Sequence, residues 1–274
     1  SAPSVMQTFL IDDATLPSRS KAAVRGRVLV RNGRIASVNP ATVPAGTPRV
    51  DAAGRLLTPG LIDMHTHGVE RWIYERGPDE LLAAGPRLAR YGTTTLVPTI
   101  VPGVTDADLE RLHRLAACLP DVPGVCVPGL HLEGPFMALS GAACPKLPGD
   151  VALLDALLDA AMGRILVMSI SPDTPNILPV IRRLRERGVV PFVTHTRASL
   201  PQARAALEAG ACHATHLYDV FPLPPEIDSG VRAPGVVELF LADPGATVDV
   251  IADGCHVDPL LVQLTARVKG PRGL

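Results

Sequence analysis

Histidines are distributed unevenly along this 274-residue chain. One of the eight, His113, lies within a helical pattern. The other seven lie in or directly after apolar, β-prone runs: His65, His67, His131, His195, His213, His216 and His256. In parallel α/β folds, the carboxyl ends of the strands carry the active site. The distribution therefore predicts that imidazoles, which bind transition metals, gather at one edge of a parallel sheet.

Five residues have the chemistry and the position expected of metal ligands. His65 and His67 are separated by one residue, so they point to the same side of a strand and can bind one ion. Glu133 ends another apolar run and is followed by a Gly-Pro pair that stops the strand. His195 and His216 lie at the ends of two further runs. Each has an ordinary explanation when taken alone. The His65–His67 pair can arise by chance, Glu133 can be a solvated glutamate, and His195 and His216 can be hydrogen-bonded core histidines. Together, the five residues predict a metal site.

Composition argues against several other functions. Lys and Arg number 26 against 27 Asp and Glu, so the net charge of −1 creates no global field for nucleic acid or an anionic membrane. The five cysteines form no Cys-x-x-Cys pair, which favours a reducing, cytoplasmic location. No apolar run approaches the length of a membrane span. Neither a Gly-x-Ser-x-Gly nucleophile turn nor a Gly-x-Gly-x-x-Gly dinucleotide turn is present.

The elements that must position these residues alternate strictly from Leu61 onward. The predicted strands are 61–67, 94–101, 125–132, 165–170, 189–195, 213–218 and 247–252, and the predicted helices are 79–91, 106–118, 151–162, 176–187, 200–209, 236–242 and 259–268. Such alternation predicts an α/β fold with a parallel sheet. A (β/α)8 barrel of ~250 residues uses ~31 residues per unit, so the segment holds about seven units. We expect a TIM-like barrel that lacks its eighth unit in this chain, with an open doubly wound sheet as the alternative.

The first 57 residues have a different texture. Short β-prone runs follow one another, and Asn32-Gly33 separates two of them. An Asn-Gly pair between such runs is a strong signal for a hairpin. We therefore expect part of a small β domain over residues 1–57 and the barrel over residues 58–274. A hairpin packed on a larger body is the alternative.

The segment Pro59-Gly-Leu-Ile-Asp-Met-His-Thr-His-Gly68 resembles the first barrel strand of the amidohydrolase superfamily. Within that superfamily, the chain is most similar to the N-acetylglucosamine-6-phosphate deacetylases. Further matching segments follow in the family's order and cover most of residues 55–260: 92–99 (GTTTLVPT), 129–136 (GLHLEGPF), 214–218 (ATHLY), 232–235 (RAPG) and 252–257 (ADGCHV).

The resemblance implies a ligand set and a cofactor. Glu133, His195 and His216 are expected to bind one divalent metal, and His65 and His67 to hold a second. Zinc is the first choice for these ions, with iron, manganese or cobalt as alternatives. A metal in such a site polarises a carbonyl group and activates a water molecule for hydrolysis of an amide.

The resemblance also implies a substrate and an assembly. The expected substrate is a small amino-sugar phosphate, deacetylated to acetate and glucosamine 6-phosphate. Substrate contacts are expected from Ala142, Asp219, Val220, Arg232 and His256. Arginine suits bidentate phosphate recognition, and Arg232 is expected to bind the sugar phosphate, often across the interface of a homodimer.

Three departures from the family pattern bear on activity. The loop after the metal-binding glutamate usually carries Gly-Ala-His, but here it reads Gly141-Ala-Ala-Cys144. Asp219 stands where an amide is usual, and its charge should repel a phosphorylated sugar. The family's catalytic aspartate lies on the eighth strand, beyond Leu274. We therefore expect this chain to be weak or inactive, and its catalytic residue is not assigned.

Two alternatives to the deacetylase follow from the same residues. One is a non-catalytic homologue that binds a metal or a ligand. The other is an amidohydrolase that acts on another N-acyl or cyclic amide. A substrate without phosphate has no need of Arg232, so the arginine favours the phosphorylated sugar over the second alternative.

Overall fold

The computed structural model describes residues 8–18, 22–141, 144–226 and 228–274. The chain divides into two compact units, Ser1–Gly60 and Leu61–Leu274. Among the described residues, no helix combines the length and the apolar character needed to cross a lipid bilayer.

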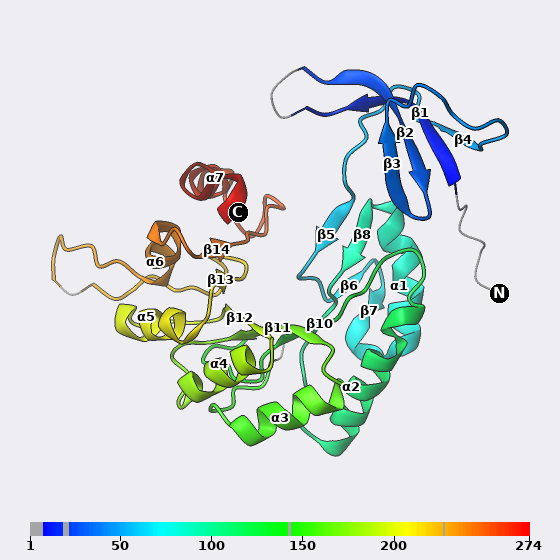
Figure 1. Cartoon of the computed structure of the whole chain (residues 1–274). Coiled ribbons are helices and arrows are strands. Elements are labelled where there is room, and N and C mark those ends of the chain that lie inside the picture. Colours follow the sequence, from blue (N-terminus) through cyan, green and yellow to red (C-terminus); the bar gives the residue numbers. More distant parts are fainter. Residues whose placement is uncertain (1–7, 19–21, 142–143, 227) are drawn as a thin grey trace. The chain divides into compact units, whose positions relative to one another are not determined.

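The first unit contains a four-stranded sheet in the order β3-β2-β1-β4 (Figure 1). Its strands are β1 (Thr8–Leu16), β2 (Val24–Arg31), β3 (Arg34–Val38) and β4 (Arg49–Asp51). β2 is antiparallel to both β1 and β3, and β4 runs parallel to β1. The predicted hairpin is confirmed: Asn32 and Gly33 connect β2 to β3, and both have the positive φ, 51° and 73°, that a two-residue turn of this kind requires.

The second unit is built on parallel strands that follow one another in chain order. β5 (Leu61–Asp63) pairs with β8 (Thr93–Leu96), and β8 leads into β9 (Thr99–Ile100). β9 begins a six-stranded sheet that continues with β10 (Leu130–Glu133), β11 (Ile165–Ile170), β12 (Val190–Val193), β13 (His213–Ala214) and β14 (Thr247–Val248). A short hairpin, β6 (Gly68–Val69) and β7 (Trp72–Ile73), follows β5. The predicted α/β class with a parallel sheet is confirmed.

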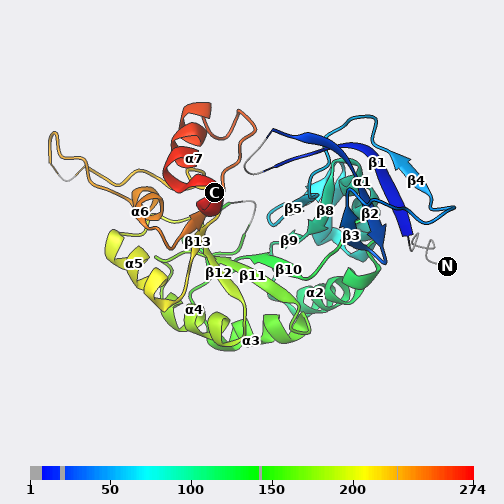
Figure 2. The ribbon, with the colours of Figure 1, turned by 45° about the horizontal axis from the view of Figure 1, so that its top comes forward.

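Helices connect these strands. They are α1 (Pro78–Arg90), α2 (Asp106–Cys118), α3 (Val151–Ala160), α4 (Ile177–Glu186), α5 (Leu200–Ala209), α6 (Val236–Ala242) and α7 (Pro259–Gly273), with 3₁₀ turns at Tyr74–Arg76 and Leu119–Asp121. Figure 2 shows the strands of this unit along an arc, with α2 to α5 on its outer side. Apolar side chains between strands and helices form one core, in which β11 is almost fully buried.

Side-chain caps fix where several helices start. Thr105 and Asp108 form a capping box at α2, and Ser199 and Gln202 form another at α5. The predicted bounds of α2, α5 and α6 agree with the structure. α7 extends beyond the predicted 268, and Gly270 interrupts it with φ 62°.

The predicted strand 165–170 agrees with β11, but several others are too long at their carboxyl ends. β12 ends at Val193 and β13 at Ala214, so both metal-ligand candidates that follow lie beyond the strands. His195 has φ 46° and His216 has φ 39°, values in the left-handed region that no strand contains. The backbone therefore leaves the sheet just before each of these histidines, and such conformations cluster at functional sites.

Candidate metal centre

Glu133 is the centre of a cluster of four imidazoles. Its carboxylate, 2% exposed, lies at the end of β10. Oε1 is 3.3 Å from Nε2 of both His195 and His216 and 3.7 Å from Nε2 of His65, while Oε2 is 3.1 Å from Nε2 of His67. The five residues form two sets that share Glu133, and within each set the ligand atoms lie within 4.8 Å of one another.

The segment after β5 supplies the first pair of imidazoles. Asp63 Oδ1 accepts a hydrogen bond from the backbone N–H of His65 at 3.1 Å. Nδ1 of His67 is 3.1 Å from Glu75 Oε1, and this oxygen also accepts a 3.0 Å bond from the N–H of Val101. Glu75 thereby orients the His67 ring so that Nε2 faces Glu133. A carboxylate behind a histidine is a common support for a metal ligand.

The second pair is His195 and His216, whose Nε2 atoms are 3.2 Å apart. The His195 carbonyl accepts bonds from Ser171 Oγ at 2.9 Å and from the N–H of Leu139 at 3.1 Å. Asp249, just after β14, accepts a short hydrogen bond from the N–H of His216. These contacts hold two left-handed residues in place, and both rings face the same carboxylate.

Gly141 leaves room for the His195 ring. A Cβ built at this position would come within 1.5 Å of His195 Cε1. The φ of Gly141 is not in the left-handed region, so space and not backbone conformation requires the glycine here. The loop after β10 therefore packs directly on a metal-ligand candidate.

Hydrogen bonds and charge couple Glu133 to the imidazoles around it. Burial alone would raise the pKa of Glu133, but hydrogen bonds from the four imidazoles lower it far below its usual range, so the carboxylate is ionised. Burial would lower the pKa of His67, but Glu133 and Glu75 raise it to about 9. The pKa of His216 is also raised: burial opposes the shift, and the hydrogen bond and charge of Glu133 outweigh it. Imidazole nitrogens around one anionic carboxylate are donors that zinc and related divalent metals prefer, so the residues fit such an ion.

The predicted substrate contacts have different surroundings in the structure. The Asp219 carbonyl is 3.2 Å from Nδ1 of His216, and Val220 follows with φ 56°, so these two adjoin a metal-ligand candidate. The Arg232 side chain is 82% exposed and bonds Glu238 Oε1 at 3.0 Å. His256 bonds Asp253 at 2.7 Å through Nδ1. Ala142 lies outside the described residues.

Several residues behind the cluster carry no assigned role in the sequence analysis. His131 is fully buried two residues before Glu133, a spacing that puts both on one side of β10. Asp249 follows the end of β14, where the rule used for the histidines also applies. Glu75 lies in the 3₁₀ turn at Tyr74–Arg76, and no local pattern marks it.

No family model matches the chain. The N-acetylglucosamine-6-phosphate deacetylase of Bacillus subtilis is 29% identical over 96% of this chain and 68% of its own length. The N-acetylgalactosamine-6-phosphate deacetylase of Escherichia coli O157:H7 is 32% identical over 86% of this chain and 62% of its own length. The chain thus spans about two thirds of the length of these relatives.

The solved structures that resemble this chain include deacetylases of the same kind. The N-acetyl-D-glucosamine-6-phosphate deacetylase of Mycobacterium smegmatis, solved as a mutant in complex with N-acetyl-D-glucosamine-6-phosphate, is 30% identical, with a TM-score of 0.80 over 98% of this chain and 69% of that one. The N-acetylglucosamine-6-phosphate deacetylase of Pasteurella multocida shares the fold with a TM-score of 0.83 at 24% identity. On this likeness over nearly all its length, the chain belongs to the N-acetylglucosamine-6-phosphate deacetylase family of metal-dependent amidohydrolases.

Proposed function

We propose that this protein hydrolyses the N-acetyl amide of an amino-sugar phosphate. Water adds to the acetyl carbonyl, the C–N bond breaks, and acetate and a protonated amine are released. The observation that carries the proposal is the buried Glu133 carboxylate within 3.7 Å of four imidazole nitrogens, in a chain of this family.

Two metal positions follow from the two ligand sets. Glu133, His195 and His216 would hold one divalent ion, and His65 and His67 with Glu133 would hold another. Zinc fits this donor set first, and iron, manganese or cobalt also fit imidazole and carboxylate ligands. When bound, such a metal polarises the acetyl carbonyl and makes water a better nucleophile at neutral pH.

The chain's own residues prepare this site. The charge of Glu133 balances part of the charge of any cation bound between the rings. Glu75 holds Nδ1 of His67 and so leaves Nε2 free toward the centre. The turn after His216 brings the Asp219 carbonyl to the ring at 3.2 Å, and this supports the assignment of Asp219 and Val220 to the border of the substrate. We assign Ala142 and His256 to the same substrate from the family pattern alone.

Arg232 is proposed to serve the site of a second copy of the chain. In its own chain it is exposed, and the partner that its guanidinium has among the described residues is Glu238. Leu223 and Val231, on the same loop, are 81% and 50% exposed. A loop that exposes apolar side chains around a phosphate-binding arginine fits the interface of a homodimer. Light scattering should give twice the chain mass, and a monomer at micromolar concentration contradicts this assignment.

Acetate release is the direct test of the reaction. The purified protein, loaded with zinc, is incubated with the 6-phosphates of N-acetylglucosamine and N-acetylgalactosamine and with unphosphorylated N-acetylglucosamine. We expect release from a phosphorylated substrate and its loss in the His195→Ala variant. Metal bound without acetate release from any of the three would favour the non-catalytic homologue. Equal metal content in the parent and in His195→Ala contradicts the ligand assignment.

A further inference from the structure

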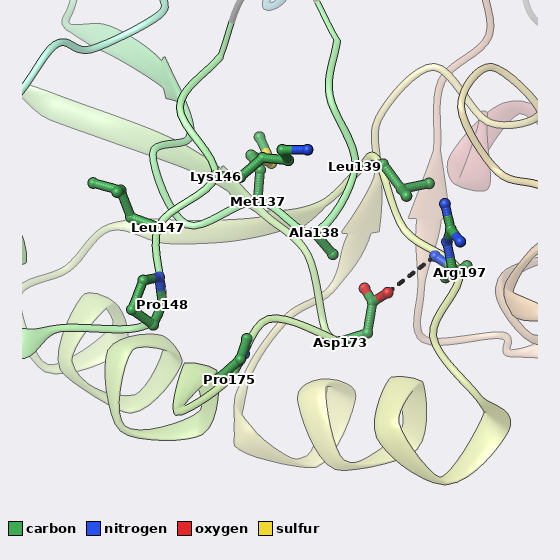
Figure 3. A pocket seen from close by; sticks show the side chains of 9 residues that line it. All are labelled: Met137, Ala138, Leu139, Lys146, Leu147, Pro148, Asp173, Pro175 and Arg197. Atoms are coloured by element: carbon green, nitrogen blue, oxygen red, sulfur yellow. Dashed lines mark hydrogen bonds between the residues drawn. The ribbon is translucent and has the colours of Figure 1, made fainter.

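A cavity of about 640 Å³ lies in the second unit, beside the loops that carry the metal-ligand candidates. Figure 3 shows its lining side chains. Part of the wall comes from the loop after Glu133, including Met137, Leu139 and Lys146, and another part from Asp173 and Arg197. Cavities of this size suit small metabolites.

Two cations line the cavity without a partner. Neither the Lys146 ammonium group nor the Arg197 guanidinium group has an ion pair or a hydrogen bond with any residue that the structure describes. In Figure 3 both side chains lie above Pro175, Lys146 at the top and Arg197 at the right, with Leu139 between them in this view. The cations are therefore free to bind an anion from solution.

The backbone under Arg197 is fixed although its side chain is free. Asp173 Oδ1 accepts a bond from the Thr196 hydroxyl, and Asp173 Oδ2 accepts one from the Arg197 N–H at 3.3 Å. Thr196 Oγ1 also accepts a 2.9 Å bond from the N–H of Ala198. These bonds use both oxygens of the one carboxylate in the lining, so Asp173 anchors the loop and is not paired with a cationic side chain.

The backbone around Lys146 is fixed in the same way. Cys144 Sγ donates to the carbonyl of Glu133 at 3.1 Å, and the N–H of Leu147 donates to the carbonyl of Pro135 at 3.0 Å. The N–H of Gly149 donates to the carbonyl of Pro175 at 2.7 Å. Little backbone ordering is thus required when a ligand binds, which favours affinity.

We propose that this cavity is a phosphate site, in which Lys146 and Arg197 together bind the phosphoryl group of a small molecule. The guanidinium group offers two parallel N–H donors to phosphate oxygens, and the ammonium group adds a point charge. Two cations against one carboxylate favour a dianion. Met137, Leu139 and Leu147 line the rest of the cavity, so the ligand also has a less polar part, as a sugar does.

This site does not include Arg232; if the phosphoryl group is the substrate's own, the inference rests on the proposed reaction and replaces the phosphate role given to Arg232, and otherwise it goes beyond that reaction. Arg197 follows His195 by two residues, and the N–H of Leu139, in the cavity wall, donates to the His195 carbonyl. An anion bound here therefore contacts loops that hold the metal centre. The phosphoryl group can belong to the amino-sugar phosphate or to a second phosphorylated metabolite, and the chemistry that Lys146 and Arg197 recognise is the same.

Calorimetric titration of the dimer or monomer, as purified, with inorganic phosphate tests the site without any need for turnover. Lys146→Gln and Arg197→Gln should each raise the Kd about tenfold, because each removes a charge-assisted contact. Arg197→Lys, which keeps the charge, should recover part of the affinity. Arg187→Gln is the matched control, because Arg187 is a surface arginine paired with Asp155 and Asp159. Unfolding midpoints should be unchanged, since neither cavity cation has a partner to lose.

The result that overturns the proposal is phosphate affinity that survives the double variant Lys146→Gln/Arg197→Gln. The proposal is also overturned if Arg232→Gln loses phosphate binding while the double variant keeps it. A second arm identifies the source with glucosamine 6-phosphate as the probe. If its affinity depends on Arg197 and also falls in His195→Ala, the ligand reaches the metal centre and the phosphate is the substrate's own. Dependence on Arg197 alone indicates a separate metabolite. Both conclusions, the substrate's own phosphate or a separate metabolite, can be drawn from this titration even if the protein releases no acetate.

Discussion

Nδ1 of His131 donates a 2.8 Å hydrogen bond to the backbone carbonyl of Met64, the residue before His65. A carbonyl can only accept, so Nδ1 carries the proton, and Nε2 accepts from Ser169 Oγ at 2.7 Å. Burial, with the neighbouring His65 as a smaller cause, lowers the pKa of His131 to about 3, so the His131 ring is neutral. The ring thus ties the short segment after β5 to β11.

Loss of the His131 hydrogen bonds should weaken metal binding, because the Met64 backbone that they hold precedes His65. His131→Leu removes the hydrogen bond to the Met64 carbonyl and leaves the buried Ser169 hydroxyl with its longer, 3.4 Å contact to Thr215 Oγ1, and each lost hydrogen bond costs about 1 kcal/mol. We expect lower stability in urea and less metal per chain, with the deficit in the set that contains His65 and His67. His131→Asn, whose amide can still donate to Met64, should keep more metal. Elemental analysis of both variants tests this, and equal metal in His131→Leu and the parent would contradict the role.

The support behind His67 gives a second prediction. Glu75→Gln keeps the size of the side chain and removes the charge that orients Nδ1 of His67. Replacing such a supporting carboxylate typically lowers metal affinity ~10- to 100-fold. We expect a weaker zinc Kd for one of two ions in a competition titration with a chelator. Glu80→Gln is the control, because Glu80 bonds the nearby N–H of Ile73 and does not touch the cluster. A similar loss in both variants would mean that general destabilisation is the cause.

Periodicity and strand ends predicted much of this arrangement from sequence. Runs of apolar residues located the strands, and caps such as Thr105 at α2 located helix starts, because both are encoded within a few residues. His65, Glu133 and His216 could be placed together because the carboxyl ends of parallel strands share an edge. The prediction needed only the strand ends and no knowledge of the loops.

The remaining parts depend on contacts between distant segments. Glu75 reaches His67 because the β6–β7 hairpin turns the chain back, and that hairpin has no strong local signal. The bond from the His216 N–H to Asp249 joins the ends of two adjacent strands and follows only from their register. Contacts from distant segments, such as the Ser171 hydroxyl and the Leu139 N–H on its carbonyl, hold His195 at its left-handed φ. Local sequence patterns determine where the helices and strands form, whereas the paths of the loops determine which residues support the metal-ligand candidates.

The loop that carries His256 gives a prediction about pH. The Asp253 carboxylate accepts bonds from the N–H groups of His256 and Cys255 and from the His256 ring, and these lower its pKa from 3.8 to about 2. A depressed carboxyl pKa contributes stability above pH ~4, and that stability is lost as the pH falls toward 2. The protection factors of the Cys255 and His256 amides, taken against the intrinsic exchange rate at each pH, should fall over this interval. Asp253→Ala should show fast exchange already at pH 6, and unchanged exchange in that variant would refute the role of the carboxylate.

Gly141 gives the sharpest test of how the loop after β10 and the metal centre are coupled. In Gly141→Ala, the new methyl group would lie within 1.5 Å of His195 Cε1, so the ring or the loop must move. Because His195 Nε2 is 3.3 Å from Glu133 Oε1, displacement of the ring separates the ligands of the set that contains His216. We expect the loss of about one metal ion per chain and a fall in any acetate release of at least tenfold. Gly245→Ala is the matched control, because the new Cβ meets only Asp243 Oδ1, at 3.3 Å. Full metal content in Gly141→Ala would show that the loop moves freely and does not position His195.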